Sequence, residues 1–347
     1  MDVRIARDSD EDLWDSMVAR SPHGTIWHTW KWLKLLERYS VLKKAGIAAK
    51  AHLEPLILTV RGRPVGICPL FFYRIMGLTY CYSPLSQEDT HYLGPLFPEL
   101  LETGERAAQV FFLDASREID RFIRKIRRSS FVHISSSPGI DDCRPFRWAG
   151  YSIEPRYTYY IDLSSGTDAI WKGFKKELRY SIEKARKEGI AVAEGGKEDA
   201  YHIWELLRKR NRVKFPKEFI GSACDAFLPD RIKIFVARKG PERLSGVILL
   251  LYRNKASLWI GPPKLPGMIL NELVIWESIA WAAAHGYRVF EIVGADDYPL
   301  FTFKRKFNGK LVQFFHMNWY SPPLSAGVAL YKALFRKDRN QIDREAA

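Results

Sequence analysis

The sequence holds few residues in patterns suited to covalent catalysis. Its four cysteines are widely scattered, with no C-x-x-C pair and no histidine cluster beside them, so it predicts no metal site. No G-x-S-x-G turn occurs, and neither the cysteines nor the eight histidines match a nucleophile signature. The sequence therefore shows no recognisable covalent nucleophile.

Cations at helical spacing are the second chemically informative feature. The segment AIWKGFKKELRYSIEKARKEG, residues 169–189, is predicted as one helix. At 3.6 residues per turn, Lys172, Lys175, Lys176 and Arg179 share one face and could follow a phosphate backbone. The net charge of +14 favours partners that carry phosphates or anionic headgroups. A solvated basic surface without a specific partner is the alternative.

The N-terminus and the hydropathy pattern indicate the compartment. The opening MDVRIARDSDEDLW is acidic and lacks the basic-then-apolar order of a signal peptide, and no apolar run approaches the 18 residues needed to span a bilayer. We expect a soluble, cytoplasmic protein with reduced cysteines, for which a peripheral membrane contact stays open.

Two hairpins of similar sequence indicate that the chain contains a repeated domain, whose strands and helices would position the candidate residues. Residues 55–74 and 234–253 each read as a strand, a polar turn with Gly, and an apolar strand ending in Tyr-Arg. The chain is long and apolar enough, at 347 residues and 47% hydrophobic, for two cores. We predict two domains, residues 1–165 and 166–347, the second opening with the basic helix. Chance similarity between two hairpins is the alternative.

Helical patterns surround both hairpins. Residues 29–39 and 200–213 are predicted helices before them, and residues 271–285 form a predicted helix after the second, followed by a strand over 288–293. This order resembles the GNAT fold, whose mixed sheet splays open to admit an acyl donor. The predicted fold class is therefore α/β, with tandem GNAT-like acyltransferase domains, each a mixed sheet flanked by helices.

Three stretches resemble the Fem family of aminoacyl-tRNA-dependent peptidyl transferases, in the same order along the chain. Ser21 to Lys34, SPHGTIWHTWKWLK, is similar to the family's opening motif, and Glu177 to Val192 to its basic helix. Phe290 to Gly309, FEIVGADDYPLFTFKRKFNG, resembles its strand and Gly turn followed by Phe-Lys, the most specific of the three. Leu36 stands where relatives with nucleotide-linked cell-wall precursors carry a second Lys, which argues against a muramyl-precursor acceptor.

The resemblance implies attack by an amine on an ester or thioester carbonyl, with release of a tRNA hydroxyl or a thiol. Phe303 and Lys304 match the catalytic motif, in which the cation lies beside the developing oxyanion or the leaving oxygen. Asp296 and Asp297 could hold the acceptor ammonium or relay its proton. The alternatives are a surface lysine in a basic run and a pair of solvated turn acids.

Five further positions are predicted to bind substrate. Arg179 and Arg210, with Lys34 by its place in the opening motif, are candidates for gripping phosphates of donor or acceptor. Trp32 belongs to the same motif, and Trp259 occupies the place of the family's aromatic residue that faces the acceptor. Surface ion pairs and core packing are the alternatives.

The predicted function is aminoacyl or peptidyl transfer from charged tRNA to an amine, such as that of a cell-envelope precursor, without a cofactor. The first alternative is an acyl-CoA-dependent transferase acting on a sugar or peptide amine, although the usual Gln/Arg-x-x-Gly-x-Gly/Ala signature is missing from residues 262–271. The second is a non-catalytic basic module that binds RNA or anionic lipid. Such a module has no need of two hairpin repeats followed by an acyl-transfer motif.

Overall fold

The computed structural model describes residues 1–44, 46–85, 90–98, 104–210, 213–262, 270–296 and 298–327. The first part of the chain contains, in order, β1 (Asp2–Ile5), α1 (Glu11–Arg20), α2 (Trp30–Tyr39), β2 (Val41–Lys44), β3 (Ile47–Lys50), β4 (His52–Val60), β5 (Arg63–Ile75), β6 (Leu78–Ser83), α3 (Glu105–Arg121), β7 (Phe131–Ser135), α4 (Arg144–Trp148) and β8 (Ser152–Asp162).

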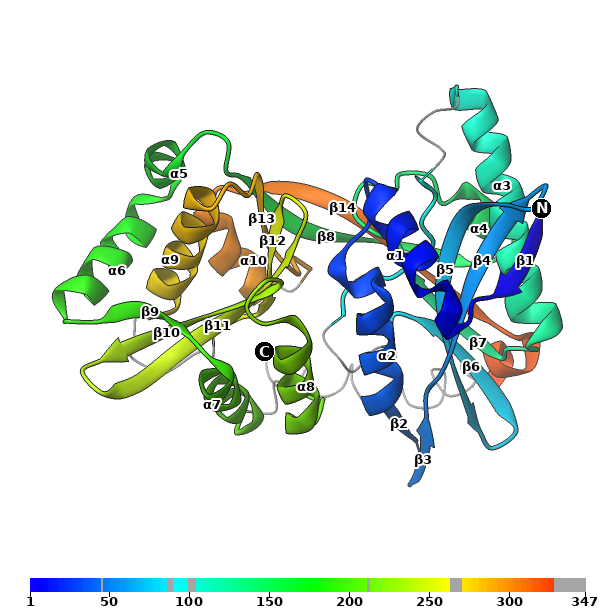
Figure 1. Ribbon diagram of the computed structural model, residues 1–347, viewed down its shortest axis with the longest axis horizontal. Coiled ribbons are helices and arrows are strands. Elements are labelled where there is room, and N and C mark those ends of the chain that lie inside the picture. Colours follow the sequence, from blue (N-terminus) through cyan, green and yellow to red (C-terminus); the bar gives the residue numbers. More distant parts are fainter. Residues whose placement is uncertain are drawn as a thin grey trace, which may run out of the picture.

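The second part contains α5 (Thr167–Gly173), α6 (Lys176–Lys187), β9 (Ala191–Gly195), α7 (Lys197–Arg208), α8 (Lys217–Phe227), β10 (Ile232–Lys239), β11 (Glu242–Tyr252), β12 (Lys255–Ile260), α9 (Leu270–Ala284), β13 (Val289–Ile292), α10 (Tyr298–Lys304) and β14 (Lys310–Tyr320). The two parts form two lobes, joined by β8 and β14 (Figure 1). The predicted boundary at 165/166 falls between β8 and α5.

One mixed sheet runs through both lobes in the order β1-β4-β5-β6-β7-β14-β8-β13-β12-β11-β10-β9. In each lobe three antiparallel strands lead to a parallel pair, β6 with β7 and β12 with β13. Each pair is joined through a helix, α3 or α9, as parallel strands require. This repeated order confirms the predicted tandem GNAT-like fold.

The two predicted hairpins have the same local geometry. Both β4–β5 and β10–β11 are antiparallel, and each register shifts at a bulge, between Leu58 and Thr59 in one and Ala237 and Arg238 in the other. These positions coincide when the two sequence segments are aligned. A bulge increases the local twist of a hairpin. The two lobes therefore share a structural detail beyond composition.

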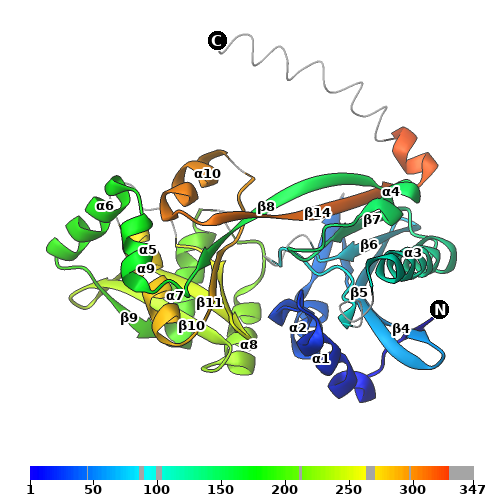
Figure 2. The same cartoon turned by 90° about the horizontal axis from the view of Figure 1, so that it is seen from above.

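The last strand of each lobe lies beside strands of the other lobe. β8 follows α4 of the first lobe and pairs with β13 of the second, while β14 follows α10 and pairs with β7 of the first. β8 and β14 also pair with each other, from Lys310–Tyr160 to Asn318–Ser152. Seen from above, the two strands arch along one side of the molecule from lobe to lobe (Figure 2).

Three apolar cores fill the space around the sheet. One lies under α3 and α4 of the first lobe and another under α5, α6 and α9 of the second. The third combines residues of α1 and α2 with residues of α7 and α8 and therefore spans both lobes. The lobes are thus joined by packing as well as by strand pairing.

The structure corrects the predicted basic helix, which is two helices. The chain is extended at Phe174, with φ −69° and ψ 147°, between α5 and α6. The Phe174 ring is 3% exposed and packs against Trp276 and Phe307. Burial of this ring stabilises a break that the helical charge pattern did not predict. α7 also differs from its predicted span, since it runs from 197 to 208.

Candidate functional site

The parallel strands β12 and β13 stop pairing at Ile292, and the side chain of Lys304 contacts the next residue, Val293. Their parallel register runs from Lys255–Val289 to Leu258–Ile292. β12 continues to Ile260 on the β11 side, whereas β13 ends at Ile292. The sheet therefore opens beyond Ile292, as expected of a GNAT-like sheet.

Lys304 is a buried cation at this opening. It is 9% exposed, and its ammonium donates hydrogen bonds to the carbonyl oxygens of Val293 and Gly294, the latter at 2.6 Å. Gly294 has a φ of +78°, a conformation that favours glycine. A surface lysine, the alternative interpretation, is wrong for this residue. The neighbouring Phe303 ring lies 5.6 Å from the Phe307 ring and packs α10 onto the segment that follows it.

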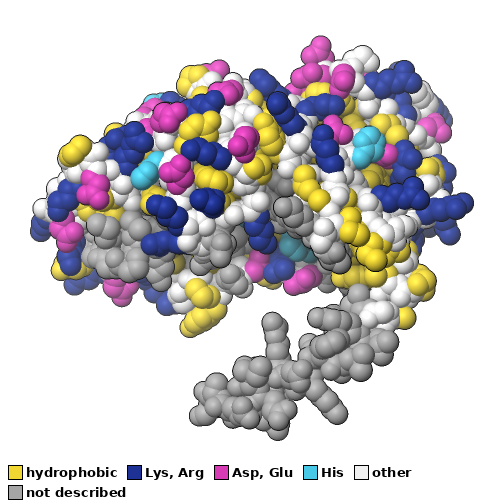
Figure 3. Space-filling model, turned by 90° about the horizontal axis from the view of Figure 1, so that it is seen from below, with side chains coloured by type: hydrophobic (Ala, Val, Ile, Leu, Met, Phe, Trp, Pro, Cys, Tyr) yellow, Lys and Arg dark blue, Asp and Glu magenta, His cyan; other side chains and the backbone are white. Residues whose placement is uncertain are grey.

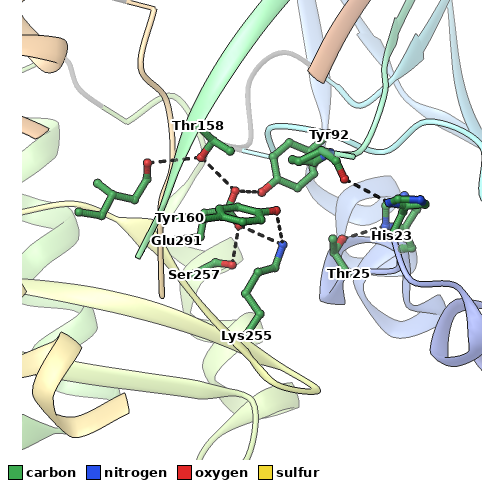
Figure 4. Close-up of polar contacts among 11 residues, drawn as sticks. His23, Thr25, Tyr92, Thr158, Tyr160, Lys255, Ser257 and Glu291 are labelled. Atoms are coloured by element: carbon green, nitrogen blue, oxygen red, sulfur yellow. Dashed lines mark hydrogen bonds and ion pairs between the residues drawn. The ribbon is translucent and has the colours of Figure 1, made fainter. Parts of the chain in front are cut away.

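Beside this opening, Glu291 is the centre of a buried polar network (Figure 4). Its side chain has no exposed surface. The carboxylate accepts hydrogen bonds from the Tyr92 hydroxyl, from Thr158 Oγ1 at 3.0 Å and from Ser257 Oγ at 2.9 Å, and it lies 3.1 Å from Lys255 Nζ. A buried carboxylate needs such partners, because an unpaired charge in the interior is costly.

The network joins the two lobes. Tyr92 belongs to the first lobe, whereas Ser257 and Glu291 lie on β12 and β13 of the second. Burial, together with the charge of Glu291, raises the pKa of Tyr92 well above its usual value, so the hydroxyl stays a donor. Lys255 Nζ also lies 3.2 Å from the hydroxyl of Tyr160. None of these residues was predicted, because their partners are distant in sequence.

Several histidines near the network are uncharged at neutral pH. Thr25 Oγ1 lies 2.8 Å from His28 Nδ1, and burial lowers the pKa of His28 to about 3. Burial also lowers the pKa of His91 to about 4, although Glu291 opposes the shift. Neutral imidazoles are cheaper to bury beside Lys255 and Lys304 than charged ones. The interior around the site therefore carries few competing positive charges.

Asp296 begins a chain of contacts across β8 and β14. It accepts a hydrogen bond from the Tyr157 amide at 3.1 Å and lies 3.9 Å from Arg156 Nη1. Arg156 Nε donates to His316 Nδ1 at 3.2 Å, and the His316 and His133 rings are 4.9 Å apart. Because Arg can only donate, His316 carries its proton on Nε2. Burial, His133 and Arg156 lower the pKa of His316 to about 3.

This chain of contacts holds the predicted Asp296 in place but was not itself predicted. Its members are far apart in sequence and meet only because β7, β14 and β8 are adjacent. The predicted role of Asp296 in holding an ammonium group stays a prediction, and Asp297 lies outside the described residues. Figure 3 shows Lys and Arg side chains spread over both lobes on the face of the molecule that is seen from below.

The opening motif docks the first lobe onto the second. Arg253 Nη1, in the β11–β12 turn, donates to the Ser21 carbonyl at 2.8 Å. Gly24 fits where no other residue would, since a Cβ there would lie 2.0 Å from the Val18 carbonyl oxygen. Leu36, the departure from the family motif, has no exposed surface and belongs to the shared core. These contacts give the motif a packing role.

Trp32 and Trp259 also pack between the lobes. Trp32 is 0% and Trp259 4% exposed, and their ring centroids are 5.2 Å apart. The Trp32 ring further contacts Phe219 and Phe227 of α8. Both rings are buried in this structure, and substrate binding by Trp32 and Trp259 stays a prediction. Core packing, the alternative, agrees with this burial.

The predicted phosphate-binding cations lie in different surroundings. Lys34 is 3.3 Å from both Asp8 and Glu37, so it has carboxylate partners within the first lobe. Arg179 donates to the carbonyls of Trp171 at 3.4 Å and Lys172 at 2.9 Å, and thereby caps the end of α5. Arg210 is exposed after α7. Phosphate binding by these residues stays a prediction.

The three predicted nucleic-acid-binding lysines, Lys172, Lys175 and Lys176, are exposed at the junction of α5 and α6. This junction lies close to the end of α10, since the Lys175 amide donates to the Lys306 carbonyl at 3.2 Å. The predicted basic surface is thus adjacent to the segment that carries Lys304. Nothing in these contacts fixes a nucleic acid as the partner.

The equivalent opening of the first lobe is filled by the chain itself. The β6–β7 register ends at Ser83–Ile134. Beyond it, Gly94 donates to the Ser135 carbonyl at 2.8 Å, and Leu96 forms an antiparallel bridge with Ile67 of β5. β6 ends at Ser83, and beyond Ser83 residues 93–96 lie between β5 and β7 in its place. Among the residues that the structure describes, the first lobe offers no open pair of strands at this point.

Within the described ranges, no group of three or more His, Cys, Asp or Glu side chains is arranged to hold a metal ion. No helix in that part of the chain is both long and apolar enough to cross a membrane.

Residues 172–305 match the family model described as an acetyltransferase (GNAT) domain. The match covers most of the second lobe and includes Lys304 at its end. No curated protein matches the sequence.

Solved structures resemble the chain over nearly its full length. A structure of FemX has a TM-score of 0.63 and 13% identity, over 91% of this chain and 97% of that one. L-PGS from Bacillus licheniformis has a TM-score of 0.51 and 14% identity, over 93% and 96%. A tandem GNAT protein from the clavulanic acid biosynthesis pathway, in a structure without AcCoA, has a TM-score of 0.51 and 11% identity, over 92% and 98%. These likenesses establish the tandem GNAT fold.

Proposed function

We propose that this tandem GNAT chain is an N-acyltransferase, which joins the activated carboxyl group of a donor to the amine of an acceptor. The observation that carries the proposal is the buried Lys304 ammonium at the opening between β12 and β13. A cation held there, shielded from water, would act on negative charge that develops during acyl transfer. The GNAT family model over residues 172–305 supports the same activity class.

The donor would bind in the second lobe. Its opening lies beside Lys304, whereas residues 93–96 fill the equivalent space in the first lobe. The first lobe contributes Tyr92 to the Glu291 network and the opening motif to the contact between lobes. Its proposed role is to form the other wall of the acceptor site.

The reaction requires an amine, an activated carbonyl and two proton transfers. The amine nitrogen attacks the carbonyl carbon, and the carbonyl electron pair moves to oxygen to give a tetrahedral oxyanion. Lys304 would stabilise this oxyanion or the leaving oxygen, since the carbonyls of Val293 and Gly294 orient its ammonium. Collapse breaks the bond to the leaving group, which gains a proton as the amine loses one. Asp296 is proposed to hold the acceptor in its ammonium form and to accept the proton that the nitrogen must lose before it attacks.

We favour charged tRNA as the donor. The exposed Lys172, Lys175 and Lys176 lie next to the segment that carries Lys304, and Arg210 is exposed on the same lobe. A tRNA acceptor end needs such contacts with its phosphates. The overall likeness to FemX agrees with this donor.

An acyl-CoA donor is the second candidate. It is favoured by the description of the matching family model as an acetyltransferase and by the likeness to the clavulanic acid pathway protein, for which AcCoA is named as a ligand absent from that structure. The third reading, a basic module that binds RNA or anionic lipid, predicts binding without consumption of either donor.

One experiment separates the three. The protein is incubated with labelled charged tRNAs or with labelled acetyl-CoA, together with a cell extract that supplies acceptors. Deacylation is followed over time, and labelled amides are identified by mass spectrometry. Amide formation from tRNA supports the favoured donor, and amide formation from acetyl-CoA supports the second. Binding of tRNA or lipid with neither donor consumed would contradict the enzyme proposal.

A further inference from the structure

A small pocket lies between the lobes at the far end of β13 from Lys304. It has a volume of about 180 Å³ and is lined by the opening motif on one side and by the β11–β12 turn on the other. We call it the seam pocket; its lining residues used below are His23, Tyr160, Arg253 and Lys255. Val289 also lines it, whereas Lys304 contacts Val293. Four residues of a strand rise about 13 Å, so the two places are distinct.

The described residues that line the seam pocket include cations and no carboxylates. Arg253 and Lys255 are its two permanently charged side chains at neutral pH. His23 shares the pocket, and its Nδ1 donates to the Pro138 carbonyl at 3.2 Å. Pocket walls of one charge sign concentrate ions of the opposite sign.

The positive charge of Lys255 is balanced by a buried carboxylate. Lys255 Nζ lies 3.1 Å from Glu291, which is fully buried and also accepts three hydroxyl hydrogen bonds. The Lys255 side chain is 16% exposed, and the hydroxyl of Tyr160 lies 3.2 Å from its ammonium. Lys255 is therefore a fixed donor at the base of the pocket rather than a mobile surface chain.

Arg253 supplies charge that no lining carboxylate offsets. Its Nη1 donates to the Ser21 carbonyl at 2.8 Å, which orients the guanidinium but leaves its charge in place. A guanidinium has five N–H donors in a rigid fork, and that geometry matches phosphate and carboxylate oxygens. The pocket thus combines an oriented guanidinium, a fixed ammonium and an imidazole.

We propose that the seam pocket binds a small oxyanion, a phosphate or a carboxylate group, between Arg253, Lys255 and His23. Its volume equals the share of about six liquid water molecules, which is room for such a group. The ligand would contact the opening motif of the first lobe and the β11–β12 turn of the second. Binding would therefore stabilise the docked arrangement of the lobes.

The first test measures thermal unfolding of the full chain in phosphate, in acetate and in chloride at matched ionic strength and pH. We expect a saturable rise in the unfolding temperature with phosphate or acetate and none with chloride. The stronger of the two identifies the ligand class. Arg253→Gln should abolish the rise, while Lys239→Gln, which removes an exposed cation from the end of β10, should keep it.

The second test uses His23 as a reporter and needs no enzymatic turnover. Burial lowers the pKa of His23, as does Lys255, whereas the Pro138 carbonyl and Asp141 oppose the shift. An oxyanion in the pocket should raise this pKa. The titration is followed by NMR, with the resonance assigned from His23→Gln. The upward shift should appear in wild type and be lost in Arg253→Gln. An equal response to chloride, or an unchanged oxyanion response in Arg253→Gln, would overturn the proposal, whatever the outcome of the acyl-transfer assay.

Discussion

At the scale of single residues, the buried Lys304 and the partly buried Lys255 contact β13 and the residues just after it in different ways. Lys255 faces the carboxylate of Glu291, whereas Lys304 donates to the backbone carbonyls of Val293 and Gly294. The two carbonyls fix the position of the Lys304 ammonium where the pairing of β12 with β13 ends. We therefore expect Lys304 to act on the negative charge that develops in the proposed reaction.

Lys304→Ala tests this role. We expect turnover to fall by about a hundred- to a thousand-fold, roughly 3 to 4 kcal/mol of transition-state stabilisation, with a smaller change in donor affinity. The carbonyls of Val293 and Gly294 would also lose a buried partner, at a cost of about 1 to 3 kcal/mol in folding stability. Single-turnover rates and denaturant unfolding measure the two effects separately.

Lys306→Ala is the matched control, because Lys306 lies in the same basic run and is 3.9 Å from Glu272. A general loss of positive field would affect both variants alike and would be masked by salt. Equal, small and salt-sensitive effects of the two substitutions would mean that Lys304 has no special role in the reaction.

Two histidines with lowered pKa values, the buried His28 and the partly buried His316, predict how stability depends on pH. The folded-state pKa values of His28 and His316 are about 3, below the unfolded value near 6.5, so the unfolded chain binds more protons. Stability should be fully present above pH 6.5 and fall as the pH drops towards 3, by at most about 1.4 kcal/mol per pH unit for each histidine. Urea unfolding at pH 7, 6 and 5 measures the slope.

His28→Gln should reduce the slope of unfolding free energy against pH by at most about 1.4 kcal/mol per pH unit, because glutamine does not titrate. If the slope of the His28 variant equals that of wild type, the burial argument for this histidine fails.

At the scale of elements, the break between α5 and α6 separates cations that the sequence pattern had grouped. Lys172 lies in the last turn of α5, and Lys176 is the first residue of α6. Arg179, which lies in α6, donates a hydrogen bond to a carbonyl at the end of α5. Arg179 therefore has a local structural role, unlike the three exposed lysines beside it. A test of nucleic-acid binding should leave Arg179 in place.

Replacing Lys172, Lys175 and Lys176 together by Ala should weaken tRNA binding and flatten its salt dependence. Each lost phosphate contact removes roughly 0.7 to 0.9 from the slope of log affinity against log salt, so the slope should fall by about 2 to 3. Fold should survive, because the three side chains are exposed. Binding is measured by filter retention at several salt concentrations.

The control replaces Lys184 and Lys187 at the opposite end of α6, where Lys184 lies 3.9 Å from Glu188. This variant loses positive charge but not the junction with α10. An unchanged slope in the triple variant, or an equal change in the control, would show that the junction is only a solvated basic surface.

At the scale of the whole molecule, strand exchange makes the lobes depend on each other. β14 pairs with β7 and β8, and the shared core contains residues of both lobes. Neither lobe can complete its sheet edge or this core alone. The two-domain division at 165/166 remains our proposal for the chain, but we do not expect its parts to unfold separately.

Calorimetry should accordingly show one unfolding transition, with the calorimetric enthalpy equal to the van't Hoff enthalpy. Residues 1–165 expressed alone should be unstable, because β7 and β8 would lose β14. Co-expression with residues 166–347 should restore a soluble complex. Two resolved transitions, or a stable fragment 1–165, would contradict this coupling of the lobes.

The hairpins, α2, α9 and the GNAT-like order were predictable because local patterns specify them. Alternating apolar residues and Gly-containing turns indicate a hairpin wherever it lies in the chain. The break at Phe174 was not predictable, since a helical run of charges gives no sign that one ring is drawn into a distant core. Similarly, the sequence marks Trp32 and Trp259 as large and apolar but not as partners of each other.

Residue types at short, regular spacings predicted the fold class, and the resemblance of residues 290–309 to the late motif of the Fem family singled out Lys304. The burial of Lys304 and the contact between Glu291 and Tyr92 became evident only in the folded chain. These facts depend on strand neighbours far apart in the chain, such as β7 beside β14 and β13 beside β8. Long-range pairing of this kind is fixed by the cooperative burial of apolar surface, and no single segment records it.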